Sequence, residues 1–157
     1  MIRPHRHGSG TAEAWAAHAR ERVAGAGHRS GGARRAVIES LAGQECCRSA
    51  QEIFDQLRAD GRRVGIASVY RVLDLLLSLG LVQRLDLGGG TSRYEPALPG
   101  GEHHHHLVCV GCGEVRPFED PGLEQALEGT AHASDYSVEG HDVVLRGRCP
   151  GCRSGHP

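Results

Sequence analysis

Residues 67–95 read ASVYRVLDLLLSLGLVQRLDLGGGTSRYE, and their pattern of apolar, polar and glycine residues is the strongest indication of the fold class. In residues 67–79, apolar side chains recur three and four positions apart, which predicts a helix that a glycine ends. Residues 81–87 alternate between apolar and polar, glycines fill 88–90, and residues 91–95 return as a second strand. A helix followed by a two-stranded ribbon is typical of a winged helix-turn-helix, whose second helix enters the DNA major groove. The pattern leaves open one alternative, a helical bundle that carries a hairpin.

Three further helices are predicted before this stretch. Periodic apolar positions indicate helices over 11–24 and 33–41, each followed by glycine. Ser49-Ala50-Gln51-Glu52 has the form of a capping box and starts the third helix. Residues 1–10 are polar and are expected to form a disordered tail. We therefore expect residues 11–95 to form a winged-helix DNA-binding domain.

The chain changes character after this domain. Residues 96–102 are rich in proline and glycine and predict a hinge. Beyond it we expect a helix that starts at Asp120-Pro121. The predicted strands are 105–109, 114–118, 136–139 and 142–149. The predicted fold class is therefore α+β, with a winged helix-turn-helix domain followed by a small α/β domain at 103–153.

Composition supports two small domains and a polyanion partner. The 157 residues contain 4% aromatics, too few for one large core, and small cores often need a metal or a second subunit. Residues 1–95 hold 14 Arg against 10 acidic residues, whereas 96–157 hold 4 Arg against 9. The basic excess in the first part favours a nucleic-acid partner. Without a long apolar stretch or a secretory signal, we expect a cytoplasmic protein with no membrane partner.

Four of the six cysteines form two CxxC motifs, Cys109-Val110-Gly111-Cys112 and Cys149-Pro150-Gly151-Cys152. Cytoplasmic cysteines stay reduced, so metal binding is a better interpretation than disulfides. Four thiolates select zinc in a closed tetrahedral site, which predicts a structural Zn²⁺ rather than a catalytic one. A redox CxxC would instead be a single motif near a βαβ unit.

Four histidines, His103 to His106, precede the first CxxC motif. In an extended strand, His104 and His106 face one side and His103 and His105 face the other, so one run can supply two metal sites. Imidazole pairs suit zinc, iron, nickel or copper. A solvated polar strand is the alternative.

These features follow the order of the ferric/zinc uptake regulator (Fur) family, which the chain resembles over about residues 25–152. The shared features are the helix-turn-helix, the sequence Ser68-Val69-Tyr70-Arg71-Val72-Leu73, the glycine-turned wing, the histidine run and the two CxxC pairs. The resemblance implies a homodimer with two regulatory metal sites. The hinge sensor site would use Cys47, Glu95, His104 and His106, with Cys46 as an alternative to Cys47. The second site would use His103, His105, Glu124 and His141.

The resemblance also implies a DNA-binding surface. Ser68, Tyr70 and Arg71 lie early in the predicted recognition helix, where Arg can bind guanine or phosphate and Tyr can pack on a thymine methyl. Arg29 occupies the position of a basic residue that reaches the minor groove. Arg34 and Arg35 are alternative phosphate contacts.

The implied function is a metal-responsive repressor of metal-uptake genes that binds a palindromic operator in double-stranded DNA, with no small-molecule substrate. The regulatory metal is Zn²⁺ or Fe²⁺, and a cysteine in the sensor favours zinc. An iron-responsive regulator of the same family is the nearest alternative. A zinc-dependent hydrolase would need an open coordination position, which four ligands per site do not leave. A zinc-buffering module would bind metal but not duplex DNA.

Overall fold

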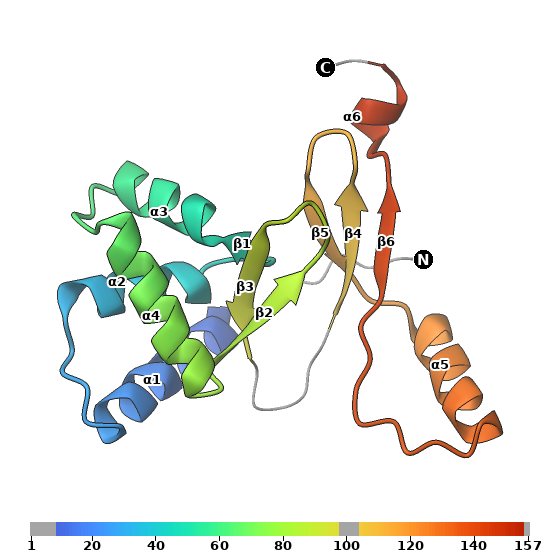
Figure 1. The fold of residues 1–157 in the computed structure, drawn as a ribbon, viewed down its shortest axis with the longest axis horizontal. Helices are drawn as coiled ribbons and strands as arrows, with labels where there is room; N and C mark the ends of the chain where they lie inside the picture. Colours follow the sequence, from blue (N-terminus) through green and yellow to red (C-terminus); the bar gives the residue numbers. More distant parts are fainter. Residues whose placement is uncertain (1–8, 98–103, 156–157) are drawn as a thin grey trace. The chain divides into compact units, whose positions relative to one another are not determined.

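The protein was analysed as a computed structural model that describes residues 9–97 and 104–155. These residues form two compact units, one ending at residue 97 and the other beginning at His104 (Figure 1). The predicted tail at 1–10 and hinge at 96–102 fall largely outside the described residues, so the domain bounds stay predictions. No helix in the described ranges is long and apolar enough to cross a membrane.

The first unit has four helices and a small sheet, as the winged helix-turn-helix prediction requires. Its helices are α1 (Ser9–Gly25), α2 (Gly32–Ala42), α3 (Ala50–Ala59) and α4 (Ile66–Ser78). Its strands are β1 (Arg48–Ser49), β2 (Val82–Asp86) and β3 (Ser92–Pro96). The sheet is antiparallel in the order β1-β3-β2, and the β2–β3 hairpin is the wing. Helix α1 begins at Ser9, two residues before the predicted start.

The helices of this unit enclose one apolar core. The buried side chains recur at helical spacing, as in Val69, Leu73 and Leu76 of α4. Trp15 of α1 is 2% exposed and donates from Nε1 to the carbonyl of Leu81, 3.2 Å away. This hydrogen bond fixes α1 to the start of the wing.

The capping box at the start of α3 is confirmed. The Ser49 hydroxyl accepts from the backbone N–H of Glu52 at 3.2 Å, and the Ser49 N–H donates to the Glu52 carboxylate at 2.7 Å. Each bond satisfies a backbone or side-chain group that the helix end would leave without a partner. The box fixes the start of α3 directly after Cys47 and Arg48.

The second unit combines a three-stranded sheet with two helices. Its elements are β4 (His105–Cys109), β5 (Val115–Phe118), α5 (Pro121–Ala133), β6 (Val144–Gly147) and α6 (Pro150–Arg153). The strand order is β5-β4-β6, with β4 antiparallel to β5 and parallel to β6. The four-residue helix α6 was not predicted.

One predicted strand of this unit is wrong. Residues 136–139 form no strand, and the predicted strand over 142–149 is restricted to β6. The apolar side chains of Tyr136 and Val138 alternate with polar ones, and this alternation produced the prediction. They are 76% and 53% exposed, however, so within the chain they bury no face that would hold a strand on the sheet.

The apolar core of the second unit is small. Of its described residues, Cys109 and Phe118 are the buried apolar ones. Two such side chains contribute only a few kcal/mol, at about 1.5–3 kcal/mol for each fully buried large apolar side chain. The unit therefore needs further stabilisation from a bound ion, a partner subunit or both.

Candidate metal centres and DNA-reading surface

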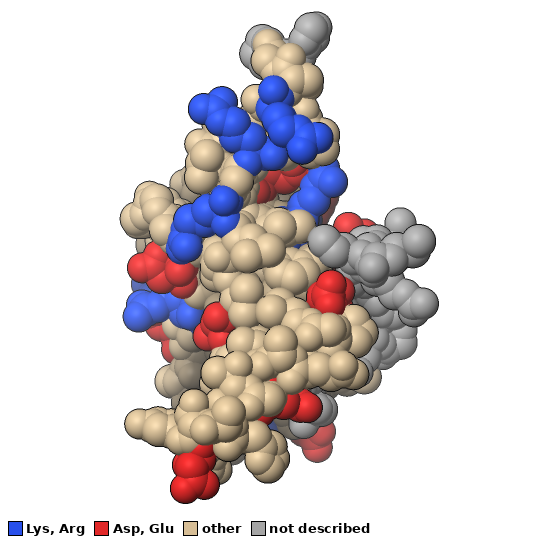
Figure 2. Space-filling model, turned by 90° about the vertical axis from the view of Figure 1, so that its right-hand side faces the viewer, with Lys and Arg blue, Asp and Glu red and all other residues tan. Residues whose placement is uncertain are grey.

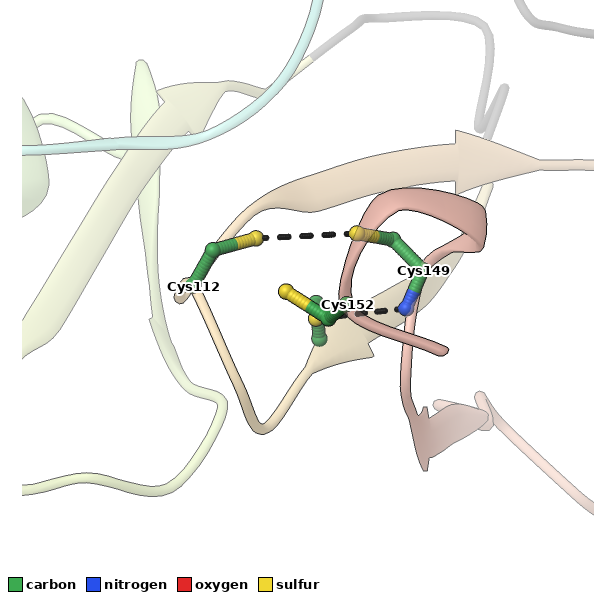
Figure 3. Close-up of side chains that lie close together, drawn as sticks. Cys112, Cys149 and Cys152 are labelled. Atoms are coloured by element: carbon green, nitrogen blue, oxygen red, sulfur yellow. Dashed lines mark hydrogen bonds between the residues drawn. The ribbon is translucent and has the colours of Figure 1, made fainter. Parts of the chain in front are cut away.

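The four cysteines of the two CxxC motifs lie together at one end of the second unit. Cys109 ends β4, Cys112 lies in the turn that follows, Cys149 caps α6 and Cys152 lies within it. All four Sγ atoms lie within 4.8 Å of one another. Figure 3 shows the side chains of Cys112, Cys149 and Cys152 converging on one point. We call this group the four-cysteine cluster.

The spacing of the cluster fits one tetrahedral ion. Two thiolates on a zinc ion, with bonds of about 2.3 Å at the tetrahedral angle, lie about 3.8 Å apart. The Sγ atoms of Cys112 and Cys149 are 3.7 Å apart. At Gly111, an added Cβ would lie 2.9 Å from the Sγ of Cys152. The turn between Cys109 and Cys112 therefore has room for glycine and not for a residue with a side chain.

Backbone donors prepare Cys109 to act as a thiolate. Its Sγ accepts from the N–H of Cys149 at 3.2 Å and from the N–H of Gly111 at 3.4 Å. The first of these bonds is the largest cause that lowers the pKa of Cys109, to about 6. Close contacts with Cys149 and the other thiols raise the pKa of Cys152 to about 12. The four thiols therefore do not all ionise readily while they lie so close together. One bound metal ion would hold all four sulfurs as thiolates.

Arginines surround this end of the unit. Figure 2 shows positive side chains gathered at the top of the visible face, the end at which α6 lies in Figure 1, and acidic side chains towards the other end. Arg116, Arg146 and Arg148 line one open groove with Cys109 and Cys149. The pKa of Arg116 is raised, first by Glu114 and then by the charges of Cys149 and Cys112. Four thiolates on a divalent ion carry a net charge of about −2, which these cations partly balance.

A second group of metal-ligating side chains joins β4 to α5. His105 Nε2 lies 2.6 Å from Glu124 Oε1, and His141 Nε2 lies 3.1 Å from Glu124 Oε2. The rings of His105 and His141 have centroids 5.3 Å apart. His105 is 1% exposed and also packs against Phe118. Three of the four residues predicted for the second site therefore lie together, and His103 lies outside the described residues.

The four residues predicted for the hinge sensor are divided between the two units. In the second unit, the rings of His104 and His106 lie on one side of the chain with centroids 4.8 Å apart. In the first unit, Glu95 belongs to β3 and Cys47 immediately precedes β1. Their assembly around one ion stays a prediction.

Two residues that sequence reasoning missed contact the ligands predicted in the first unit. Gln83 Nε2 donates to Glu95 Oε1 at 2.5 Å, and the two residues are register partners in the wing. Arg93 Nη1 donates to the carbonyl of Cys47 at 3.3 Å and to Glu52 Oε2 at 3.0 Å. The pairing of Gln83 with Glu95 follows from the hairpin register about the glycine turn, so the sequence held a signal for it. The Arg93 contacts depend on tertiary packing and left no sequence signal.

Cys46 and Cys47 are in side-chain contact. Their Sγ atoms lie 3.8 Å apart, and the hydrogen bond between the two thiols, followed by burial, strongly raises the pKa of Cys47. The structure therefore does not single out one of the two cysteines as the ligand.

The predicted DNA contacts of the first unit lie on its surface. Tyr70 is 49% exposed on α4, and the next residue, Arg71, is also exposed. The Arg71 Nη2 donates to the Ser68 hydroxyl at 3.2 Å. Arg29 is exposed in the loop before α2, and its carbonyl accepts from the Arg34 guanidinium. The side chains on α4 can contact a groove, because none of them belongs to the buried core.

Comparisons with known proteins give one consistent result. The profile of the Ferric uptake regulator family matches residues 25–146. The ferric uptake regulation protein of Legionella pneumophila is 41% identical over 105 residues, covering 67% of this chain and 76% of that protein. The solved ferric uptake regulator of Vibrio cholerae has a TM-score of 0.73 at 35% identity, covering 82% of this chain and 98% of that one. The Helicobacter pylori ferric uptake regulator, described as having three functional metal-binding sites, has a TM-score of 0.78 at 26% identity, covering 91% and 94%.

Proposed function

Because the chain belongs to the Ferric uptake regulator family, we propose that it is a homodimeric repressor that binds a palindromic operator when its regulatory sites hold metal. As a member of this family, the protein is a metal-responsive transcription regulator and not an enzyme. The zinc-hydrolase alternative is therefore rejected.

One observation supports the proposal: β3 is a strand of the wing, and it also carries or contacts the two metal ligands predicted for the first unit. This strand forms half of the wing, carries Glu95, and holds Cys47 through the contact of Arg93 with its carbonyl. The same unit exposes Tyr70 and Arg71 on α4. A metal that binds Cys47 and Glu95 would therefore act on the strand that pairs with β2, and β2 directly follows the proposed recognition helix α4.

The mechanism follows from where the ligands lie in the sequence. The hinge sensor takes Cys47 and Glu95 from the first unit and His104 and His106 from the second. Metal binding then fixes the orientation of the two units, and in a dimer it sets the spacing of two recognition helices against half-sites about one helical turn apart. Changing a 1:99 equilibrium to 99:1 requires about 10⁴-fold tighter binding to the closed state, or about 5.5 kcal/mol. Two regulatory sites in each chain can share this requirement.

The second unit supplies the dimer and the structural ion. The four-cysteine cluster binds Zn²⁺, and His105, Glu124 and His141 with His103 form the second regulatory site. The small core supports both assignments, since an ion adds folding energy and a partner can cover exposed apolar side chains. Tyr136, Val138 and Leu145 are such side chains, at 76%, 53% and 47% exposed.

We favour Zn²⁺ over Fe²⁺ as the regulatory metal, because a thiolate in the sensor is a softer ligand than the imidazole and carboxylate donors that suit iron. The DNA contacts that we propose are Ser68, Tyr70 and Arg71 in the major groove and Arg29 in the minor groove.

The test is anaerobic binding of the protein to duplex DNA from its own promoter region, with Zn²⁺, Fe²⁺, Mn²⁺ or chelator at controlled free concentrations. Binding at trace zinc, with iron needed at much higher concentrations, is the expected result. Binding driven by micromolar iron instead would reassign the metal. A folded dimer that binds no DNA with any of these metals would contradict the repressor proposal and leave a zinc-buffering role.

A further inference from the structure

Adjacent residues rarely direct their side chains to one point. In an extended chain successive side chains alternate between opposite sides. Cys46 and Cys47 depart from this rule, because the chain bends at Cys46 on its way from α2 to β1. Their Sγ atoms consequently lie 3.8 Å apart, with Cys47 buried and Cys46 partly buried. We call these two residues the vicinal thiol pair.

The separation of the pair is the one that a shared metal ion requires. Two thiolates bound to one tetrahedral ion at about 2.3 Å lie about 3.8 Å apart. The four-cysteine cluster offers an internal standard, since its Cys112 and Cys149 Sγ atoms are 3.7 Å apart. The vicinal thiol pair thus has the same sulfur spacing as two ligands of a cluster that fits a tetrahedral ion.

The chain beyond the pair is held in place from several sides. The Cys47 carbonyl accepts from Arg93, which is also bound to Glu52. The next residue, Arg48, pairs with Tyr94 in the sheet, and Ser49 closes the capping box of α3. A bound ion would therefore meet a largely preformed pair, and little ordering entropy would be lost on binding.

We propose that Cys46 and Cys47 bind one thiophilic divalent cation together, as a two-thiolate clamp within the regulatory site. This inference rests on the proposed function and deepens it, because it makes both cysteines ligands instead of one. The two sulfurs complete a tetrahedron with two of the other donors proposed for the hinge sensor. A site with two sulfur ligands favours zinc or cadmium and discriminates against Fe²⁺ and Mn²⁺.

The experiment counts the thiolates on a spectroscopic ion. The full-length protein, prepared anaerobically with one zinc ion per chain, receives one equivalent of Co²⁺, and the sulfur-to-cobalt charge-transfer band is recorded. The variants are Cys46→Ser, Cys47→Ser and the double variant. Glu45→Gln is the matched control, since Glu45 is an exposed residue of the same loop. Trp15 fluorescence shows for each variant whether the first unit is folded.

The clamp predicts that each single serine variant loses about half of the charge-transfer intensity, that the double variant loses all of it, and that Glu45→Gln loses none. Full intensity in Cys46→Ser would overturn the clamp. A companion variant, His104→Ala, separates the two levels of inference. If it removes cobalt binding while Cys46→Ser has no effect, the proposed regulatory site stands and the clamp fails. A band that none of these variants changes comes from the four-cysteine cluster and overturns both.

Discussion

Arg93 and Glu52 form a two-point ion pair that joins the wing to the start of α3. Nη1 of Arg93 lies 3.0 Å from Oε2 of Glu52, and Nη2 lies 3.3 Å from Oε1. The same carboxylate accepts from the backbone N–H of Ser49. One acidic side chain thus completes a helix cap and ties β3 to the loop that carries Cys47.

The first prediction concerns Glu52→Gln and pH. Burial raises the pKa of Glu52, but the hydrogen bonds from Ser49 and the charge of Arg93 outweigh it, so the pKa lies below its ordinary value of 4.5. Glutamine preserves the capping box and loses the ion pair. We expect it to destabilise the first unit by about 0.5–1 kcal/mol at pH 7, since Glu52 is partly exposed.

The sign of the pH dependence follows from the lowered pKa. The carboxylate contributes stability above its ordinary pKa, and this contribution is lost as the pH falls through the lowered value of the folded state. The difference between wild type and Glu52→Gln should therefore shrink from pH 7 to pH 4 in urea unfolding followed by Trp15 fluorescence. Glu13→Gln, at an exposed acid of α1, is the control. A difference that grows towards acid would contradict the assignment.

The second prediction separates two similar glycines of the four-cysteine cluster. A Cβ at Gly111 would lie 2.9 Å from Cys152 Sγ, whereas at Gly151 its nearest cluster neighbour, Cys149 Sγ, would be 3.9 Å away, an ordinary contact. Gly111→Ala should therefore weaken zinc binding at least tenfold in competition with a chromophoric chelator. Gly151→Ala should remain within a factor of about three. Equal zinc affinities for the two variants would show that the turn at Gly111 can shift to accommodate the added Cβ.

Local patterns predicted the first unit well, because its signals lie within single elements. The capping box at Ser49 and the glycine turn at 88–90 each act over a few residues, and both elements form where expected. The two-residue strand β1 was missed because it exists only through pairing with β3. The strand expected at 136–139 failed for the converse reason: an alternating pattern was present, but no strand in the part of the chain that the structure describes pairs with it.

Site prediction depended on how far apart the ligands lie in sequence. The CxxC motifs can be recognised from the local sequence. Glu124 and His141, considered one at a time, look like ordinary surface residues. Only the family resemblance connected them with His105. The contacts of supporting residues such as Arg93 could not be predicted, because the sequence of a strand does not show which carbonyl a cationic side chain will contact.

The third prediction tests the second metal site. Glu124 accepts from both His105 and His141, at 2.6 and 3.1 Å, so it holds the two imidazoles at one point. Glu124→Gln should lower the number of bound regulatory ions by one per chain and leave the structural zinc in place, as measured by metal analysis after dialysis. Glu128→Gln, one helical turn further along α5 and exposed, is the matched control. Unchanged metal content in Glu124→Gln would show that the three residues form a hydrogen-bonded group and not a site.

The fourth prediction concerns Gln83 as a positioning residue. Its amide donates to Oε1 of Glu95 and so orients this carboxylate within the wing. Gln83→Ala should weaken regulatory metal binding about 10- to 100-fold, the usual effect of removing a partner of a metal ligand. Metal titration followed by DNA binding measures the change, and Gln83→Glu should not restore it, because two carboxylates would repel each other. Wild-type metal affinity in Gln83→Ala would place Glu95 outside the sensor.

The last prediction concerns the recognition helix. If Tyr70 contacts thymine through its ring and Arg71 contacts guanine or phosphate, Tyr70→Phe should preserve operator affinity, because the ring remains. Tyr70→Ala and Arg71→Ala should each lower the operator affinity by about 1–3 kcal/mol, or roughly 5- to 150-fold, as measured by fluorescence anisotropy with metal present.

The salt dependence of binding then separates the two possible roles of Arg71. A phosphate contact lowers the slope of log K against log[salt] by about one, whereas a guanine contact weakens binding to the cognate duplex and leaves non-specific binding unchanged. Arg20→Ala, at an exposed position of α1, controls for the loss of one positive charge. If that variant weakens binding as much as Arg71→Ala does, then α4 makes no privileged contact and the recognition helix must be sought elsewhere in the first unit.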